Sequence, residues 1–222
     1  MLLGILQQQS PGGSPPQPSE PSTSSGTGTL RMRDRFTGEE GIALTKHQPE
    51  LGQGWMLSSG VSPIIRSGRV VGDGAGVGLV RVADTALSKT MAPAVEVVIA
   101  SFNTSQLLSR YNYISLCQMN VAPAYIAFRD VEDGHVYVRR TGAELASSIW
   151  VDRVLDSGAL KEGDRLKLAK TSAGVLYAFH NDTEVWKRDE GDAQIPFGWP
   201  RLSMTPHGFE LSSYAAYSDW SR

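Results

Sequence analysis

The sequence predicts an all-β domain, either a sandwich or a barrel. After Leu30, short apolar runs alternate with turn residues and give about ten candidate strands at hairpin spacing. Several of these runs alternate between apolar and polar residues, which is the pattern of a half-buried strand. Only residues 83–91 and 101–111 could hold a helical turn, and both segments are brief.

The first strands of the central region are typical of a buried sheet. Residues 94–102 and 113–119 are almost continuous apolar runs. Residues 124–130 and 135–142 flank an Asp-Gly turn, so we expect them to pair as a hairpin. The glycine-rich segment 72–78 does not have the spacing of a phosphate-binding loop, and it leads into an apolar run typical of a strand.

The C-terminal strands show the clearest alternation. Within residues 163–171, Leu166 and Leu168 face one way, and Arg165 and Lys167 face the other. The next segment alternates Val175, Tyr177 and Phe179, reaches a tight turn at Asn181-Asp182 and returns through residues 183–189; residues 198–204 and 209–218 add two more candidates.

The N-terminal segment has a different composition. Residues 10–29 consist almost entirely of Pro, Gly, Ser and Thr, and such a segment cannot bury enough apolar area to order itself. It is either a solvated tether or an extended arm that becomes ordered on neighbouring chains. The second hypothesis makes residues 1–30 a docking arm and residues 31–222 the sandwich. Its anchoring side chains would be Leu2, Leu3, Ile5 and Leu6.

The bulk properties exclude several classes of partner. The net charge of −2 argues against a nucleic-acid-binding face, which requires an excess of basic residues. No apolar run approaches the roughly 20 residues that span a bilayer, so we expect no membrane partner. Cys117 is the single cysteine, which excludes an internal disulfide, and it lies in an apolar run typical of a core residue.

No catalytic or cofactor motif is present in the sequence. It has no zinc-protease, paired-cysteine, nucleophile-elbow or P-loop pattern. The acidic group Asp130, Glu132 and Asp133 suits a polar hairpin turn, with a calcium site as the alternative. We therefore predict no catalytic residue, metal or cofactor. The four histidines lie far apart, at His47, His135, His180 and His207.

The aromatic residues allow two interpretations. Trp150, Trp186, Trp199 and Tyr217 lie on or beside candidate strands. Their rings could fill the core or an interface, or they could stack on sugars through an apolar body and a polar tip. Exposed, coplanar rings would favour glycan binding.

The most patterned stretch is residues 34–55, DRFTGEEGIALTKHQPELGQGW. Its spacing resembles the opening of concanavalin A-like (laminin G-like) jelly-roll domains, a variety found in virion proteins of tailed bacteriophages and in some bacterial surface proteins. The hairpin within residues 163–189 and the Gly-x-Pro-x-Leu segment within residues 198–204 resemble the same family. The likeness covers residues 34–220. One departure is Asn181-Asp182, where the family has Asn-Gly.

The resemblance implies a two-sheet antiparallel jelly-roll sandwich with an extended N-terminal arm. The patterned stretch is then scaffold, in which His47 and Asp34 fix loops by hydrogen bonds. The acidic motif of the family's glycanases is absent, so we do not expect an enzyme. The apolar members would fill the core and the others would shape turns: Phe36, Leu44 and Trp55 in the core, with Gly41, Pro49 and Gly52 at the turns.

For function, the resemblance favours a phage virion structural protein, first of all a minor tail or tail-tip component attached through its arm. The alternatives are a capsid decoration or cement protein, and a carbohydrate-binding module that recognises a host surface glycan. The expected partners are other virion structural proteins, further copies of this chain in the particle, and host surface polysaccharide.

Overall fold

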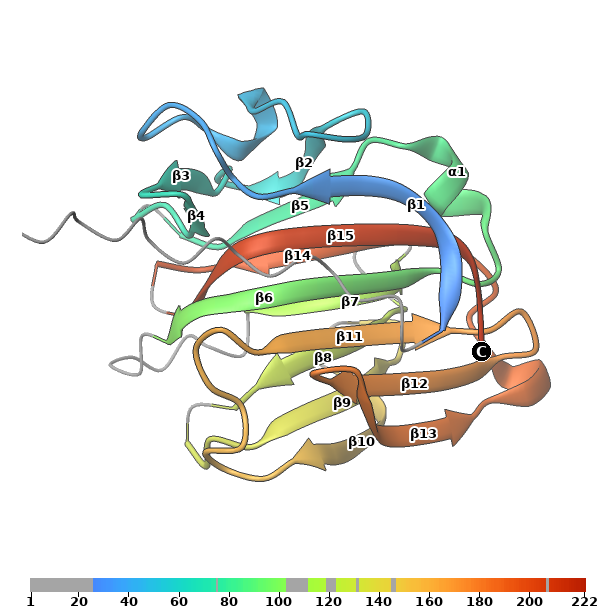
Figure 1. The fold of residues 1–222 in the computed structure, drawn as a ribbon. Coiled ribbons are helices and arrows are strands. Elements are labelled where there is room, and N and C mark those ends of the chain that lie inside the picture. The colour runs from blue at the N-terminus through green and yellow to red at the C-terminus, as the bar shows by residue number, and fades with distance from the viewer. Residues whose placement is uncertain are drawn as a thin grey trace, which may run out of the picture.

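The computed structural model describes residues 26–74, 76–102, 112–118, 123–130, 132–144, 147–206 and 208–222. These residues form two antiparallel β-sheets that pack face to face, so the predicted two-sheet sandwich is confirmed (Figure 1). The proposed anchors Leu2, Leu3, Ile5 and Leu6 lie outside the described residues.

One sheet has eight strands and contains the C-terminal strand of the chain. Its longest member, β15 (Phe209–Ser221), pairs with β6, β4 and β1. In spatial order the sheet runs β13 (Thr183–Asp189), β12 (Val175–His180), β11 (Arg165–Lys170), β6 (Ala94–Phe102), β15, β4 (Arg69–Val71) and β3 (Ile64–Arg66), with β1 (Thr27–Asp34) also paired to β15.

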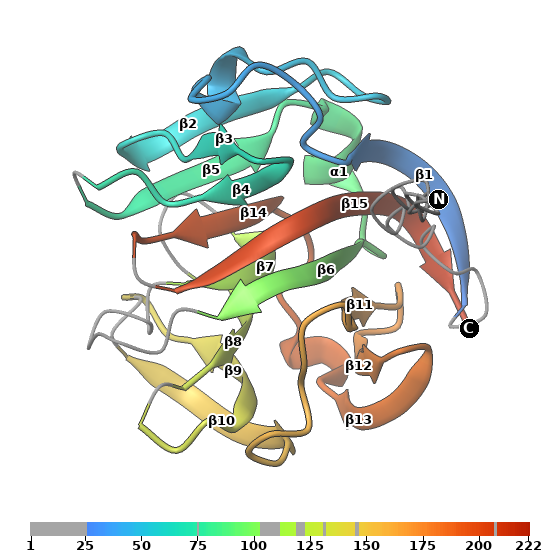
Figure 2. The same cartoon turned by 60° about the vertical axis from the view of Figure 1, so that its left-hand side comes forward.

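The other sheet has seven strands and lies behind the first in Figure 1. Figure 2 shows the same two layers after a rotation of 60° about the vertical axis. In spatial order the strands are β10 (Ser148–Leu155), β9 (Val136–Thr141), β8 (Tyr125–Arg129), β7 (Tyr113–Gln118), β14 (Trp199–Met204), β5 (Gly78–Val82) and β2 (Trp55–Gly60).

Helical structure among the described residues is limited to short segments. The helix α1 (Thr85–Lys89) confirms the helical turn expected within residues 83–91, and the Asp84 side chain caps it by accepting a hydrogen bond from Ala86 N at 2.8 Å. Two 3-10 turns, η1 (Leu44–Lys46) and η3 (Gly191–Ala193), complete the set. In the second candidate segment, residues 101 and 102 end β6, and residues 103–111 lie outside the described residues.

The strand bounds agree with the sequence where the apolar pattern is strong. β6 and β13 have the predicted bounds, whereas β10, with its mostly exposed side chains, has no counterpart among the predicted strands. The strand β1 begins at Thr27, so residues 27–30 belong to the sandwich rather than to the expected arm. They are ordered because the long strand β15 supplies backbone hydrogen-bond partners as far as Ser221.

The main core lies between the sheets and follows the period-two alternation of the strands. Leu166 and Leu168 enter it, as predicted. The alternating set Val175, Tyr177 and Phe179 faces the outer side of the eight-stranded sheet instead, where it packs in a second cluster with Trp220.

The patterned stretch at residues 34–55 is a packing and hydrogen-bonding unit, as predicted. Phe36, Leu44 and Trp55 are buried in the core. The buried carboxylate of Asp34 accepts hydrogen bonds from Phe36 N at 2.7 Å and Trp55 Nε1 at 2.8 Å, and it lies 2.9 Å from His47 Nε2. Gly52 has φ of +112°, and a Cβ there would lie 2.9 Å from the Arg31 carbonyl oxygen, so a side chain does not fit.

Candidate functional site

The four aromatic residues predicted to bind glycan lie in three separate places. Trp150 and Trp186 face inward between the edge strands β10 and β13. Trp199 lies on β14 at the outer face of the seven-stranded sheet, opposite Gln118 of β7. Tyr217 lies on the outer face of the eight-stranded sheet, with Lys167 Nζ 5.6 Å from its ring centre. They do not form a single coplanar platform.

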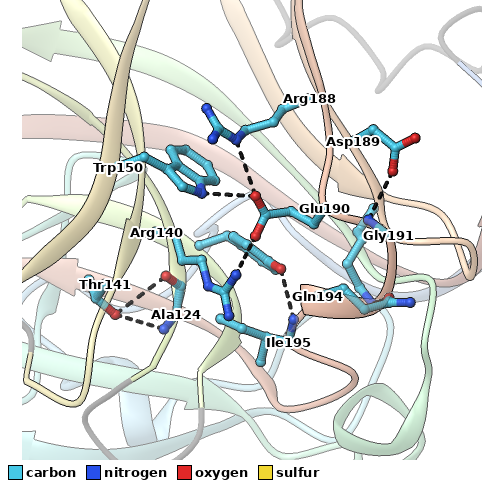
Figure 3. A network of polar contacts seen from close by, with 12 residues as sticks. Ala124, Arg140, Thr141, Trp150, Arg188, Asp189, Glu190, Gly191, Gln194 and Ile195 are labelled. Carbon is cyan, nitrogen blue, oxygen red and sulfur yellow. Dashed lines mark hydrogen bonds and ion pairs between the residues drawn. The ribbon is translucent and has the colours of Figure 1, made fainter.

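Trp150 shares a polar network at the edge of the sandwich with Arg140, Arg188 and Glu190 (Figure 3). Trp186 lies beside Trp150. Their ring centres are 5.8 Å apart. Trp150 Nε1 donates to Glu190 Oε1 at 2.9 Å, and Arg140 Nη1 donates to Glu190 Oε2 at 2.6 Å. The Arg188 guanidinium lies 4.3 Å from the centre of the Trp150 ring.

Arg188 joins the two carboxylates of this network. Its Nη1 donates to Asp152 Oδ2 at 3.0 Å and its Nε donates to Glu190 Oε1 at 3.1 Å, while Trp186 Nε1 also donates to Asp152 Oδ2. Burial opposes the charge of Arg188, but Asp152 and Glu190 raise its pKa above the ordinary value. We call this set the edge clamp; it consists of Arg140, Trp150, Asp152, Trp186, Arg188 and Glu190.

The edge clamp fastens the two sheets together. Both indole N–H groups donate to carboxylates that also hold arginines, so its polar groups are engaged within the protein. Asp152 comes from β10 of one sheet, and Arg188 comes from β13 of the other. The arrangement therefore suits a scaffold role.

Residues 194–196, which follow the edge clamp in the chain, are held by buried polar groups. Tyr125 Oη accepts a hydrogen bond from Ile195 N at 2.8 Å. The fully buried Lys170 donates to Gln194 Oε1 at 2.7 Å and to the Pro196 carbonyl at 3.3 Å, and burial lowers its pKa. These contacts fix the loop between β13 and β14.

The outer face of the seven-stranded sheet carries a different set of side chains. Because directly opposed residues of antiparallel strands point to the same face, the strand register defines two rows across it. One row consists of Met56, Arg81, Arg201, Ser115, Ile126, Arg139 and Val151, and the next consists of Ser59, Leu79, Ser203, Tyr113, Phe128, Tyr137 and Arg153.

The first row places arginines side by side. Arg81 and Arg201 are directly opposed on β5 and β14, and Arg139 lies further along on β9. The Arg81 guanidinium lies 3.8 Å from the centre of the Trp199 ring. No residue of the two rows is acidic. We call Arg81, Arg201 and Arg139 the arginine row.

Arg201 is the most unusual member of the arginine row. It is only 4% exposed, and its Nε has no hydrogen-bond partner among the described residues; the same is true of Arg81 Nη1. Burial and the neighbouring Arg81 lower the pKa of Arg201 to about 10, with Tyr113 acting in the opposite direction. Arg201 is thus still charged at neutral pH.

Neutral polar groups surround the arginine row. Ser115 Oγ donates to Gln118 Oε1 at 2.8 Å, and Tyr113 is hydrogen-bonded to Gln118 and Ser203. Burial raises the pKa of Tyr113, although Arg201 and Arg139 act against this, so its hydroxyl stays neutral at physiological pH. Ser115, Tyr113 and Gln118 are themselves buried, so the accessible groups of this face include the half-buried Trp199 and Arg81.

Other predicted features have structural explanations. Asp130 Oδ1 accepts from Glu132 N at 2.9 Å and Asp133 Oδ1 accepts from His135 N at 2.8 Å, so these acids close the hairpin turn. Within the described ranges, no group of three or more His, Cys, Asp or Glu side chains is placed to hold a metal ion. Cys117 is buried, and burial raises its pKa to about 12. No helix of the described chain is long and apolar enough to cross a membrane.

Solved structures with a similar architecture include a carbohydrate recognition domain and a legume lectin-like domain. The metal-free Emp46p carbohydrate recognition domain has a TM-score of 0.50 at 13% identity, covering 83% of this chain and 97% of that domain. A legume lectin-like domain from Entamoeba histolytica has a TM-score of 0.52 at 11% identity, covering 74% and 89%. The metal-free VIP36 exoplasmic/lumenal domain has a TM-score of 0.51 at 10% identity, covering 87% and 96%.

The chain has a concanavalin A-like fold. No protein-family model matches the sequence, and no curated protein matches it either. At these identities the likeness concerns the fold, so function must be argued from the side chains of this chain.

The arginine row was not among the residues selected from the sequence. Arg81 and Arg201 lie 120 positions apart and meet only through the pairing of β5 with β14. The local alternation indicates that Arg201 and Leu202 face opposite ways, but it does not indicate which strand is the neighbour.

Proposed function

We propose that this chain is a carbohydrate-binding module whose ligand lies on the outer face of the seven-stranded sheet. The observation that carries the proposal is Trp199, a half-buried ring on this outer face with the half-buried Arg81 guanidinium stacked on it. Sugars are bound by this combination, since their apolar ring faces stack on indoles and their hydroxyls need donors and acceptors. The fold shared with a carbohydrate recognition domain and a legume lectin-like domain supports the same proposal.

The other predicted aromatic residues are less suited to this role. Trp150 and Trp186 face inward and their N–H groups are already bonded to Glu190 and Asp152. Tyr217 lies on the opposite side of the sandwich from Trp199.

Glycan-array screening followed by calorimetric titration tests the proposal. Trp199→Ala should weaken binding by about tenfold or more, given about 1–3 kcal/mol for a lost aromatic–ligand stack. Tyr217→Ala is the matched control on the other outer face and should leave the affinity unchanged. If Tyr217→Ala lost the affinity and Trp199→Ala kept it, the ligand would lie on the eight-stranded sheet and the proposed site would be wrong.

We also propose that the module binds without hydrolysing its ligand. The two carboxylates of the edge clamp are bonded to Arg188, and the two outward rows of the seven-stranded sheet contain no acid. Prolonged incubation with a bound glycan should release no new reducing ends.

The virion role indicated by the sequence stays a prediction, as does a location in the tail, at its tip or on the capsid. A carbohydrate-binding sandwich carried by an arm is compatible with it, because the arm would dock on particle proteins and the sandwich would contact host polysaccharide. Since β1 starts at Thr27, the deletion that tests the arm is residues 1–25. The truncated chain should fold normally and fail to enter particles, as measured by mass spectrometry of purified particles.

A further inference from the structure

The pairing of Arg81 with Arg201 is unfavourable for the fold by itself. Like charges directly opposite each other in an antiparallel pair destabilise a sheet. Here one of the two is almost fully buried, which adds the cost of removing a guanidinium from water. The charge of Arg81 repels the charge of Arg201 and thereby helps to lower the Arg201 pKa.

The described part of the chain supplies no acid to offset these charges. The ion pairs that its residues form lie at the edge clamp, on the eight-stranded sheet and at the turns, and none involves Arg81 or Arg201. Of all the acidic residues in the sequence, only Glu20 lies outside the described ranges. Arg81 and Arg201 thus have no acidic partner among the described residues, and the half-buried Arg81 leaves part of its side chain accessible to an external anion.

We propose that the outer face of the seven-stranded sheet binds an acidic glycan, with a sugar carboxylate held between Arg81 and Arg201. This inference rests on the proposed carbohydrate-binding function and names the ligand class of the same site. The planar guanidinium fork matches a carboxylate in a bidentate manner. Trp199, on which Arg81 is stacked, offers the adjoining surface for the sugar ring.

The geometry favours a polymer over a single acidic sugar. Arg139 is in the same row, separated from Arg201 by β7 and β8, which places it roughly 14 Å away at about 4.8 Å per strand. We expect a second carboxylate along the polymer to reach Arg139, in addition to the contact that Arg139 already makes with the Phe128 ring. Nucleic acid is a poorer fit, because the whole protein has a net charge of −2 and its basic residues do not form an extended patch of phosphate contacts.

Calorimetric titration of the full chain with matched polymers tests the inference. The probes are polygalacturonate, alginate, hyaluronan and polysialic acid, each compared with its own methyl ester, which has the same backbone without charge. At least one acid form should bind about tenfold or more tightly than its ester, as expected for charge-assisted hydrogen bonds. Arg201→Gln and Arg81→Gln should each remove that difference.

Matched controls separate this inference from the proposed function. Arg69→Gln removes one positive charge from an exposed pair on the other sheet and should leave acid binding unchanged. If esters and acids bind equally and Trp199→Ala abolishes both, carbohydrate binding stands and the acidic-ligand inference is overturned. Three other outcomes would also overturn the acidic-ligand inference. They are failure of all the acid forms to bind, equal binding of the acid forms by Arg201→Gln and the wild type, and tighter binding of single-stranded DNA. Circular dichroism of Arg201→Gln is measured as well, so that a loss of binding is not confused with a loss of folding.

Discussion

Two regions of the sandwich place an arginine over a tryptophan, and they differ in what else the arginine contacts. In the edge clamp, Arg188 lies 4.3 Å from the centre of the Trp150 ring and binds two carboxylates. On the outer face of the seven-stranded sheet, Arg81 lies 3.8 Å from the centre of the Trp199 ring and faces another arginine.

The difference separates a structural role from a binding role. A cation that is paired within the protein stabilises the fold and has no capacity left for a ligand. A cation with no acidic partner among the described residues reduces stability and can still bind an external anion. The same pair of residue types thus contributes to stability at the sandwich edge and, by our proposal, to binding on the outer face.

The largest effect should come from breaking the edge clamp. Glu190 is 5% exposed in its side chain and accepts from Arg140, Trp150 and Arg188. Glu190→Ala leaves these donors unsatisfied and should lower the free energy of unfolding by about 3–5 kcal/mol. Urea denaturation measures it. Glu210→Ala, which breaks the exposed pair with Arg69, is the control and should cost no more than about 1 kcal/mol.

Truncating the two tryptophans should give opposite patterns. Trp150→Ala removes a ring packed between Tyr125 and Trp186 and should cost about 3 kcal/mol of stability. It should leave the affinity for glycan unchanged in the folded fraction. Trp199→Ala should cost clearly less stability and lose the binding. Equal loss of stability in both variants would mean that Trp199 is a packing residue too.

The limits of prediction from this sequence follow the same division. Features encoded in local alternation were predictable: β6, β13, the turn at Asn181-Asp182, where both residues have positive φ, and the hydrogen-bonding role of Asp34 and His47. The face on which each tryptophan lies was not predictable. Alternation groups residues by face, but it does not indicate which face packs in the core.

The sites themselves depend on strand register over long distances. The edge clamp needs β10 of one sheet to lie against β13 of the other, and the arginine row needs β14 between β5 and β7. A single sequence does not contain those pairings in any local pattern. The edge strand β10 was also missed because its exposed apolar residues Ile149 and Val151 alternate with partly buried or polar ones, which blurs the usual pattern.

A smaller effect should follow from removing one arginine of each region. Arg188→Met leaves Asp152 and Glu190 with fewer donors and should lower the free energy of unfolding by about 1–3 kcal/mol. Arg201→Met removes a buried, repelled charge and should leave stability unchanged or raise it by about 1 kcal/mol. Thermal and urea unfolding of the two variants measure the difference in sign. A strongly destabilised Arg201→Met would show that Arg201 supports the fold and would remove the argument from its unfavourable placement.

The smallest effect should be the response of binding to pH. Affinity for an acidic glycan should be constant from about pH 5 to 9, because the groups around the ligand keep their charge over that range. Burial holds the pKa of Tyr113 above its ordinary value, so it stays neutral, and Arg201, with a pKa of about 10, stays positive. Below about pH 4 the sugar carboxylate gains a proton and binding should fall, since carboxyl groups of this kind titrate near 3.5. With a pKa of about 10, Arg201 would lose half of its positive charge by about pH 10, so binding should fall again above about pH 9. Calorimetric titrations across this range check the profile, with Arg201→Gln as the control that should have no comparable plateau. A midpoint near pH 6.5 would instead indicate a histidine in the site, and the arginine row would then not be the group that recognises the ligand.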